Sequence, residues 1–143
     1  MFRFKLVSLS GIQFDDDVYE VLLPTMEGEI GVLAKHMPLV SVAKTGVIAV
    51  RREARDPDDA REYFATNGGV IEVEGGELRV LVDEADHAAD INEAEAQAAY
   101  DRAQKMKSEA TDEVSLERAQ QLVDRHAVRL QVTSLKRRHQ NRS

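Results

Sequence analysis

The glycines and prolines of this chain are confined to its first part. All eight glycines and all three prolines precede Asp90, and none follows it. Because these residue types form turns and interrupt helices, they divide the first part into short segments, whereas the last part can form long helices. We therefore expect two domains, residues 1–85 and residues 86–143.

The first part has the pattern of short β-strands. Phe2, Phe4 and Leu6 alternate with polar side chains, as in a strand that buries one face. Further apolar runs occupy residues 18–23, 30–33, 39–42, 47–50, 70–73 and 78–82. We expect turns at residues 44–46, 67–69 and 75–76, a strand end at Pro24, and a solvated hairpin loop at 53–61. Strands this short and this regularly spaced favour an antiparallel sandwich or barrel.

The last part has the periodicity of two amphipathic helices. The expected apolar stripes are Ala96, Ala99, Ala103, Met106 and Ala110 on the first helix, and Leu116, Ala119, Val123, Ala127 and Leu130 on the second. Asp90 with Glu93, or Asn92 with Glu95, caps the first helix, and the second starts near Thr111 or Asp112. A short link between them predicts an antiparallel hairpin. Because alanine buries little apolar area, this hairpin should be weakly held. A two-position switch requires this, although many alanine-rich hairpins do not switch.

The net charge of −7 is unevenly distributed along the chain. Six basic residues and no acidic residue follow Asp124, namely Arg125, Arg129, Lys136, Arg137, Arg138 and Arg142. An acidic body repels nucleic acid, whereas a basic end either complements a helix dipole or docks on an acidic partner. No stretch approaches the ~18 apolar residues of a membrane helix, and cysteine is absent. We therefore expect a soluble protein on the cytosolic side.

Motifs for catalysis and metal binding are missing. The sequence has no glycine-rich phosphate loop and no nucleophile elbow. The acidic runs at 15–17 and 53–61 lack the spacing of a calcium loop, and the four histidines are not spaced as metal ligands. His36 is either a solvated loop residue or a contact residue. We therefore predict no metal site and no catalytic residue.

Two stretches of the sequence carry a family resemblance. Residues 23–39 read LPTMEGEIGVLAKHMPL, and residues 64–73 read FATNGGVIEV. Both resemble the stretches that identify the epsilon subunit of F-type ATP synthases, and the order of strands and helices matches as well. The resemblance implies an amino-terminal β-sandwich that binds the gamma subunit and rests on the ring of c subunits. It also implies a non-catalytic rotor subunit whose C-terminal helical hairpin restrains ATP hydrolysis.

The resemblance also implies which residues make contacts. Glu27, Glu29 and His36 fall in loops that face the c ring in this family, and the loop at 34–36 reads Ala-Lys-His instead of the usual Pro-Gly-His. The basic residues Lys136, Arg137 and Arg138 suit docking on the catalytic alpha and beta subunits. Such a subunit is peripheral, on the cytoplasmic face of the membrane, and reaches the membrane only through the complex.

Some members of the family bind ATP between the two helices, through an I/L-D-x-x-R-A motif and two arginines of the second helix. The corresponding positions here are Ile91, Asn92, Glu95, Ala96, Arg125 and Arg129. Both arginines match, but Asn92 replaces the aspartate of the motif and Glu95 replaces its arginine. Since Glu95 would repel the phosphates, we expect no ATP site and no other cofactor.

Two other classes of protein fit parts of the sequence. A free-standing adaptor with a coiled-coil arm has the same periodicities and would bind an unrelated helical partner. An RNA-binding protein would use the basic end, but no aromatic residue lies there to stack on bases.

Overall fold

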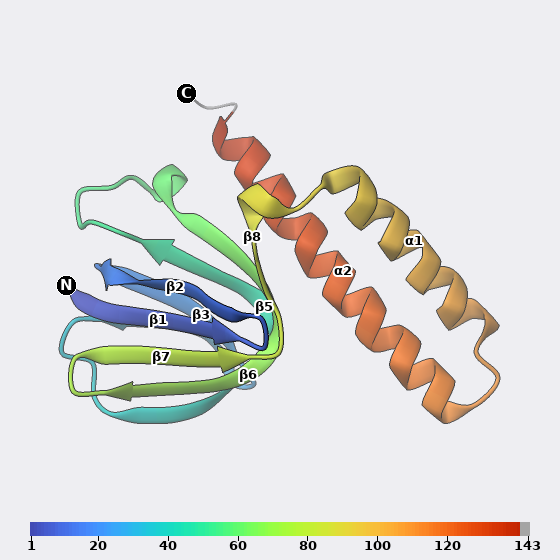
Figure 1. Ribbon diagram of the computed structural model, residues 1–143, viewed down its shortest axis with the longest axis horizontal. Helices are drawn as coiled ribbons and strands as arrows, with labels where there is room; N and C mark the ends of the chain where they lie inside the picture. The colour runs from blue at the N-terminus through green and yellow to red at the C-terminus, as the bar shows by residue number, and fades with distance from the viewer. Residues whose placement is uncertain (141–143) are drawn as a thin grey trace.

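The computed structural model describes residues 1–140, with side chains up to Arg138. A curled, eight-stranded sheet is followed by two long helices, of which the second lies against its outer face and the first packs on the second (Figure 1). The strands are β1 Phe2–Ser8, β2 Gly11–Val18, β3 Glu20–Thr25, β4 Gly28–Leu33, β5 Leu39–Arg51, β6 Glu62–Glu74, β7 Glu77–Val82 and β8 Ala85–His87. Their order is β2-β1-β7-β6-β5-β3-β4, and β8 pairs with β6. All pairs are antiparallel except β1 with β7, so the predicted antiparallel β-sandwich is confirmed with one parallel pair.

The core of the sandwich lies between the inner faces of the curled sheet. Phe2, Phe4 and Leu6 are buried there, as the alternation along the first strand predicts. Phe14 packs against Phe4, with ring centroids 5.3 Å apart, and meets Phe64 edge to face at 6.0 Å. These aromatic contacts join β1, β2 and β6, and thereby hold the two layers of the sandwich together.

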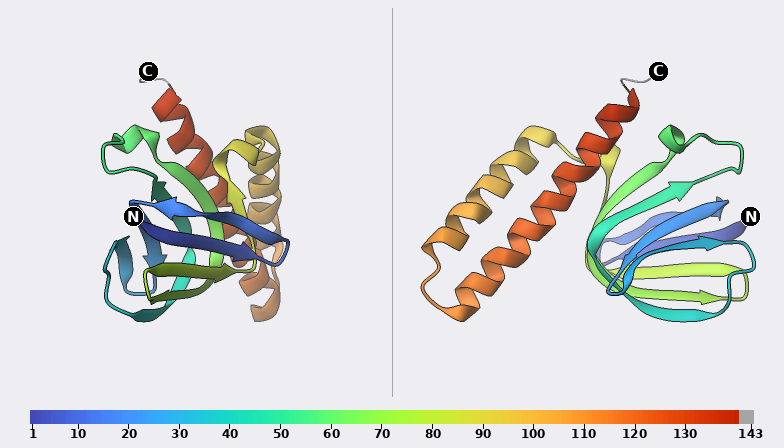
Figure 2. Two further views of the ribbon diagram at one scale, coloured as in Figure 1. Left: turned by 60° about the vertical axis from the view of Figure 1, so that its left-hand side comes forward. Right: turned by 180° about the vertical axis from the view of Figure 1, so that it is seen from behind.

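Two of the predicted turns are wrong. Residues 44–46 lie inside β5 and residues 67–69 lie inside β6, so each of these strands is 13 residues long. The two strands keep one register, but the pairing skips Lys44 and Gly68, which face each other. Gly68 takes φ 102°, which lets both strands bend together instead of ending (Figure 2). A Cβ on the neighbouring Gly69 would lie 1.9 Å from the carbonyl oxygen of Leu81, so these glycines serve a close strand crossing and not a turn.

Pro24 does not end its strand. It lies within β3 and pairs with Glu29 of β4, while the pairing of β3 with β5 is interrupted between Leu22 and Thr25. Proline lacks the backbone N–H that hydrogen bonding to a second strand requires. Pairing with β5 is therefore interrupted at Pro24, while β3 continues along β4. The acidic run at 15–17 also belongs to a strand, β2, that the sequence did not predict.

The other turns agree with the sequence. Gly75 and Gly76 connect β6 to β7 with φ of 59° and 78°, the positive angles of a two-residue hairpin. The solvated loop connects β5 to β6 and contains a short 3-10 helix, η1 Asp58–Ala60. A second short helix, η2 Ala88–Asp90, follows β8 and leads into the long helices.

The helical hairpin consists of α1 Glu93–Glu109 and α2 Glu113–Gln140. Asn92 caps α1 by accepting a hydrogen bond from the Glu95 N–H at 3.0 Å, so the second of the two predicted caps is correct. Asp112 accepts from the Ser115 N–H at 2.7 Å where α2 begins, as predicted. The buried positions of α1 and of the first half of α2 are Ala96, Ala103, Ala119 and Val123, all members of the predicted stripes. Met106 and Leu116 belong to the same stripes but are each 45% exposed, since they lie near the tip of the hairpin, away from the sheet.

The second half of α2 differs from the prediction. Ala127 is exposed, whereas Val128 and Val132 are buried. The reason is that α2 packs against two surfaces: against α1 and against the outer face of β5 and β6. Its apolar stripe therefore turns from the partner helix to the sheet, which a single-face periodicity does not anticipate.

Candidate interaction surfaces

The hairpin covers one half of the outer face of the sheet. Val128 and Val132 of α2 form a buried cluster with Ala49 of β5 and Ala65 of β6. Tyr63, Ala88 and four partly buried apolar residues complete this cluster. The side chains that meet here are mostly small, so the apolar area gained by docking is modest.

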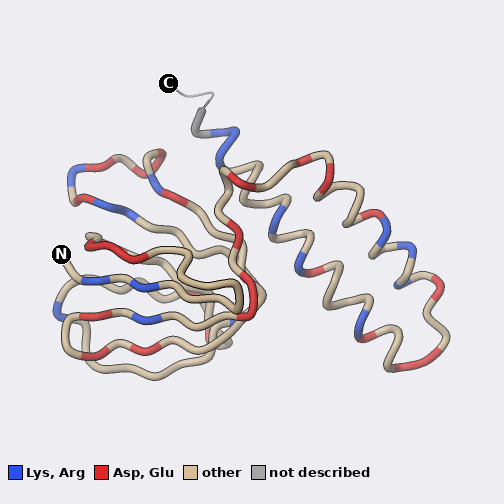
Figure 3. Tube along the Cα trace, in the orientation of Figure 1, with Lys and Arg blue, Asp and Glu red and all other residues tan. Residues whose placement is uncertain are grey.

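A row of ion pairs, which we call the charged seam, borders this cluster. Arg125 of α2 pairs with Glu84, and Arg129 Nε lies 3.3 Å from Asp86 Oδ2. Glu84 follows β7 and is fixed in turn, because its backbone N–H donates to Asn67 Oδ1 at 2.9 Å. Figure 3 shows this acidic segment of the sandwich beside the basic residues of α2. The seam therefore ties the second helix to the segment that connects the two parts of the chain.

The charged seam is not fully hydrogen bonded. Glu84 Oε2, Arg125 Nε and Arg129 Nε are buried without a hydrogen-bond partner, although their charged groups lie at ion-pair distance. The side chains of both pairs are partly exposed, and ion pairs of this kind add little net stability because water screens their attraction. The seam therefore orients the hairpin more than it stabilises it.

The other half of the outer face carries an apolar stripe that no other part of the described chain, residues 1–138, covers. Neighbouring strands place apolar residues opposite one another in the order β2, β1, β7, β6 and β5. The stripe consists of Ile12, Val7, Leu81, Val70 and Val42, each in register with the next. Paired residues lie on the same face of a sheet, so the five side chains form one continuous row.

The exposure of this stripe is unusual for apolar side chains. Ile12 is 59% exposed, Val42 57%, Leu81 42% and Val70 41%. Met26 extends the row beyond β5, since its N–H donates to the carbonyl oxygen of Val42 at 3.4 Å, and its side chain is exposed. Contiguous exposed apolar residues of this kind mark an interaction site, whereas single ones need no explanation.

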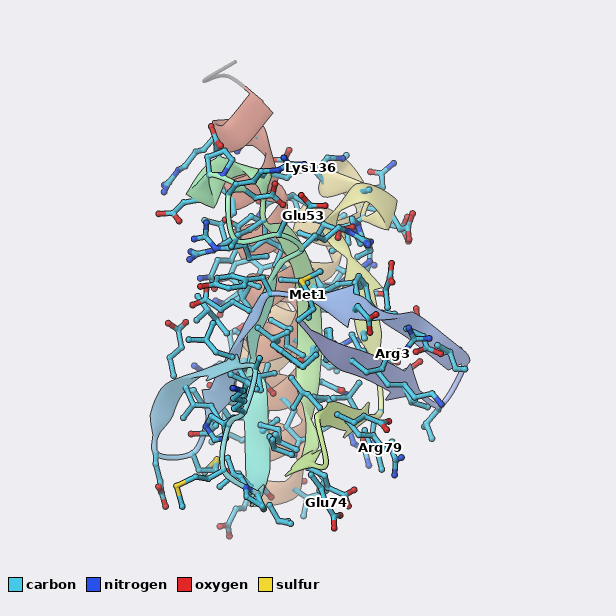
Figure 4. All side chains as sticks on the ribbon, turned by 90° about the vertical axis from the view of Figure 1, so that its left-hand side faces the viewer. Met1, Arg3, Glu53, Glu74, Arg79 and Lys136 are labelled. Atoms are coloured by element: carbon cyan, nitrogen blue, oxygen red, sulfur yellow. The ribbon has the colours of Figure 1, made fainter. Side chains whose placement is uncertain are left out.

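Charged side chains border the apolar stripe on the same face. Lys5, Arg79 and Glu72 form the next cross-strand row on β1, β7 and β6. Arg79 pairs with Glu77 at 3.3 Å and lies 3.8 Å from Glu72. Arg3 and Arg79 project from the same side of the sandwich (Figure 4). An apolar centre with a polar rim is the usual composition of a protein–protein interface.

The structure separates the three residues that the sequence grouped as ring contacts. Glu27 and Glu29 are exposed together at the β3–β4 turn. His36 is half-buried in the β4–β5 loop, where its Nδ1 donates to the Met37 carbonyl oxygen at 2.7 Å. The β4 strand separates the two places, so they lie at its opposite ends, roughly 20 Å apart at the usual rise per residue.

Most residues of the degenerate ATP motif have packing, capping or ion-pairing roles within the protein itself. Ile91 packs on the cluster under α2, Asn92 caps α1, and Ala96 is buried. Glu95 is exposed on the first turn of α1. The two matching arginines, Arg125 and Arg129, are the ones held in the charged seam.

The basic residues at the end of α2 are engaged to different degrees. Arg137 pairs with Glu93 of α1 at 2.8 Å and so closes the open end of the hairpin. Lys136 is half-buried and Arg138 is exposed, while Arg142 and the last residues of the expected tail lie outside the described residues. Across residues 1–138 no three His, Asp or Glu side chains are grouped as metal ligands.

Two features were not predicted from the sequence: the apolar stripe, and the packing of α2 against both α1 and the sheet. Val42, Val70 and Leu81 each belong to an apolar run that also contains core residues, so their hydrophobicity alone does not separate them from the core. Only the strand register shows that they face outward in one row.

This architecture defines a β-sandwich protein with a docked helical hairpin and an exposed apolar row suited to binding another protein. Residues 1–88 match the family described as ATP synthase, Delta/Epsilon chain, beta-sandwich domain, and residues 89–134 match its long alpha-helix domain. The chain is 32% identical to the ATP synthase epsilon chain of Lacticaseibacillus casei over 91% of its length and 92% of that chain. It is 33% identical to the epsilon chain of Staphylococcus aureus over 85% of its length and 87% of that chain.

Solved structures show the same fold at lower identity. A chain of the Euglena gracilis mitochondrial ATP synthase superposes with a TM-score of 0.75 at 22% identity, covering 92% of this chain and 79% of that one. A chain of the Tetrahymena thermophila mitochondrial ATP synthase, from a structure of its central stalk and c ring, superposes with a TM-score of 0.60 at 16% identity, covering 94% and 95%. The chain belongs to the delta/epsilon family as an ATP synthase epsilon chain, a non-catalytic subunit of that enzyme.

Proposed function

We propose that this chain is a rotor subunit of the central stalk of an F-type ATP synthase. In this role the sandwich joins the gamma subunit to the c ring during proton-driven ATP synthesis, and the C-terminal helices restrain ATP hydrolysis. Membership of the epsilon family supports the proposal, as does the division of the chain into a sandwich and a docked hairpin.

The exposed apolar stripe is the observation that supports a contact with the gamma subunit. It stays uncovered while the hairpin is docked, and charged residues on β1, β6 and β7 border it. A rotor subunit must hold its partner through every turn of the rotor, so its binding surface cannot depend on the position of the hairpin. The half of the face that α2 leaves open meets this requirement.

The ring contact is assigned to the turn that carries Glu27 and Glu29. Both carboxylates are exposed and lie next to each other at one end of the sandwich. His36 lies at the other end of β4, so in this proposal it makes a separate contact, independent of the acidic turn. The chain reaches the cytoplasmic face of the membrane only through the complex, and no helix within residues 1–140 is long and apolar enough to cross it.

The hairpin restrains hydrolysis by leaving the sandwich and reaching the catalytic alpha and beta subunits. Its contacts with the sandwich are small apolar side chains and incompletely hydrogen-bonded ion pairs, which separate at low cost. Release would free Arg125 and Arg129, while opening of the hairpin itself would free Arg137 for an acidic partner. ATP has no assigned role in this release, since Glu95 disfavours its binding.

The proposal is tested by ATP hydrolysis of an F1 core depleted of its own epsilon chain. We expect the full chain to bind the core and lower its hydrolysis rate. A version that ends at Asp90 keeps β8 and η2, so it should bind with the same affinity and leave the rate higher. If neither version binds, the chain is an adaptor for another helical partner and the proposal is wrong.

A further inference from the structure

His126 lies where the two helices and the sandwich meet. It is a half-buried residue of α2, next to the two arginines of the charged seam. The charges that act on its ring are Arg125 and Arg129 of α2, Arg102 of α1, and Glu84 of the segment after β7. Three positive groups therefore surround one histidine, and both nearby acids, Glu84 and Asp86, already pair with arginines.

The hydrogen bond of His126 fixes its protonation state in the docked hairpin. Nη1 of Arg129 lies 3.4 Å from Nδ1 of His126. A guanidinium group can only donate, so Nδ1 must accept and the imidazole is neutral. The same guanidinium reaches Asp86 through its Nε at 3.3 Å. Arg129 thus joins the neutral ring to the sandwich.

A proton on Nδ1 would break this arrangement in two ways. Arg129 would lose its acceptor, and a fourth positive charge would join the three arginines around the ring. Burial, followed by the charges of Arg129, Arg125 and Arg102, lowers the pKa of His126 below its usual value. The docked state therefore binds fewer protons than a state with the ring in water, so docking is favoured above about pH 6.5 and is lost as the pH falls.

We propose that His126 is a proton-sensitive latch, which holds the hairpin on the sandwich when neutral and releases it when protonated. The rest of the docking surface opposes release only modestly, because most buried side chains of the cluster under α2 are alanine or valine and its larger apolar side chains, apart from Tyr63, are only partly buried. Acidification of the surrounding compartment would then free the hairpin without any nucleotide. The consequence for ATP hydrolysis rests on the proposed function, whereas the latch itself is a property of the isolated chain.

The latch is tested by NMR on the full-length isolated chain. Contacts between the methyl groups of Ala49 or Ala65 and those of Val128 or Val132 report the docked hairpin. Between about pH 7.5 and pH 5.5 we expect the docking equilibrium to shift several-fold toward release, with about tenfold as the upper limit for one proton whose pKa is about 6.5 in the released state. Signals from Phe4 and Phe64, in the sandwich core, show whether the sandwich itself stays folded.

Two variants at His126 and one control complete the test. His126→Asn keeps an acceptor toward Arg129 but cannot gain a proton, so its hairpin should stay docked at both pH values. His126→Arg carries the permanent charge and should be released at both. His36→Gln, in the β4–β5 loop, removes a histidine far from the seam and should respond like the unmodified chain. The latch is contradicted if the docking equilibrium of the unmodified chain is the same at about pH 5.5 as at about pH 7.5, or if that of His126→Asn shifts with pH as much as that of the unmodified chain. It is also contradicted if His126→Arg is docked as fully as the unmodified chain is at about pH 7.5. None of these outcomes depends on binding to ATP synthase, so this experiment tests the latch independently of the proposed function.

Discussion

Lys35 adopts a backbone conformation that favours glycine. Its φ is 67°, in the left-handed region, where a side chain costs about 1–2 kcal/mol. The family resemblance places a glycine at this position, in Pro-Gly-His. The loop between β4 and β5 thus has a backbone that suits glycine at a position occupied by lysine, and the lysine carries the conformational cost.

Replacing Lys35 by glycine should stabilise the protein. Relief of the left-handed strain exceeds the extra chain entropy that glycine loses on folding, for a net gain of about 0.5–1 kcal/mol. Lys44→Gly is the matched control, because Lys44 is also exposed but lies within β5 at an ordinary φ, and it should destabilise by a similar amount. Thermal or denaturant unfolding measures the free energy of unfolding of both variants. An equal loss of stability in Lys35→Gly and Lys44→Gly would show that Lys35 is not strained.

At the scale of the elements, local chemistry predicted the helix starts and one hairpin, and long-range pairing decided the rest. Asn92, Asp112 and the Gly75-Gly76 pair act through neighbours a few residues away, so their roles follow from sequence alone. The bends of β5 and β6 do not, because Gly68 and Gly69 are turn residues by propensity. Their place inside a strand depends on the opposite strand and on the close approach of β7.

The start of α2 should depend on pH through Asp112. Its carboxylate accepts the Ser115 N–H, which lowers the pKa of Asp112 below its usual value. A depressed carboxyl pKa contributes stability that is present above about pH 4 and is lost as the pH falls through the folded pKa. The amide NMR signal of Ser115 should therefore titrate below about pH 4, and the first turn of α2 should fray there.

Asp112→Asn provides the control for this prediction. The asparagine oxygen still caps the helix, but it does not titrate in this range. The Ser115 signal should then be constant with pH. A Ser115 signal that still titrates as in the unmodified chain would mean that another group controls the start of α2.

At the scale of the whole molecule, the outer face of one sheet is divided between two tasks. The half under α2 holds the hairpin through Ala49 and Ala65, and the other half presents the apolar stripe. The sequence predicted the sandwich, the hairpin and the family. It did not predict this division, because strand register places residues from β2, β1, β7, β6 and β5 in one row and no local pattern contains that information.

The most direct test of this account is the affinity of the full chain for an isolated gamma subunit, measured by calorimetry with Val70→Asp. Val70 lies within the stripe, between Leu81 and Val42, and a charge on its exposed side chain should weaken binding at least about tenfold without unfolding the sandwich. Val114→Asp makes the same change at an exposed position near the tip of the hairpin and should bind like the unmodified chain. Undiminished binding of Val70→Asp would contradict the claim that the apolar stripe holds gamma.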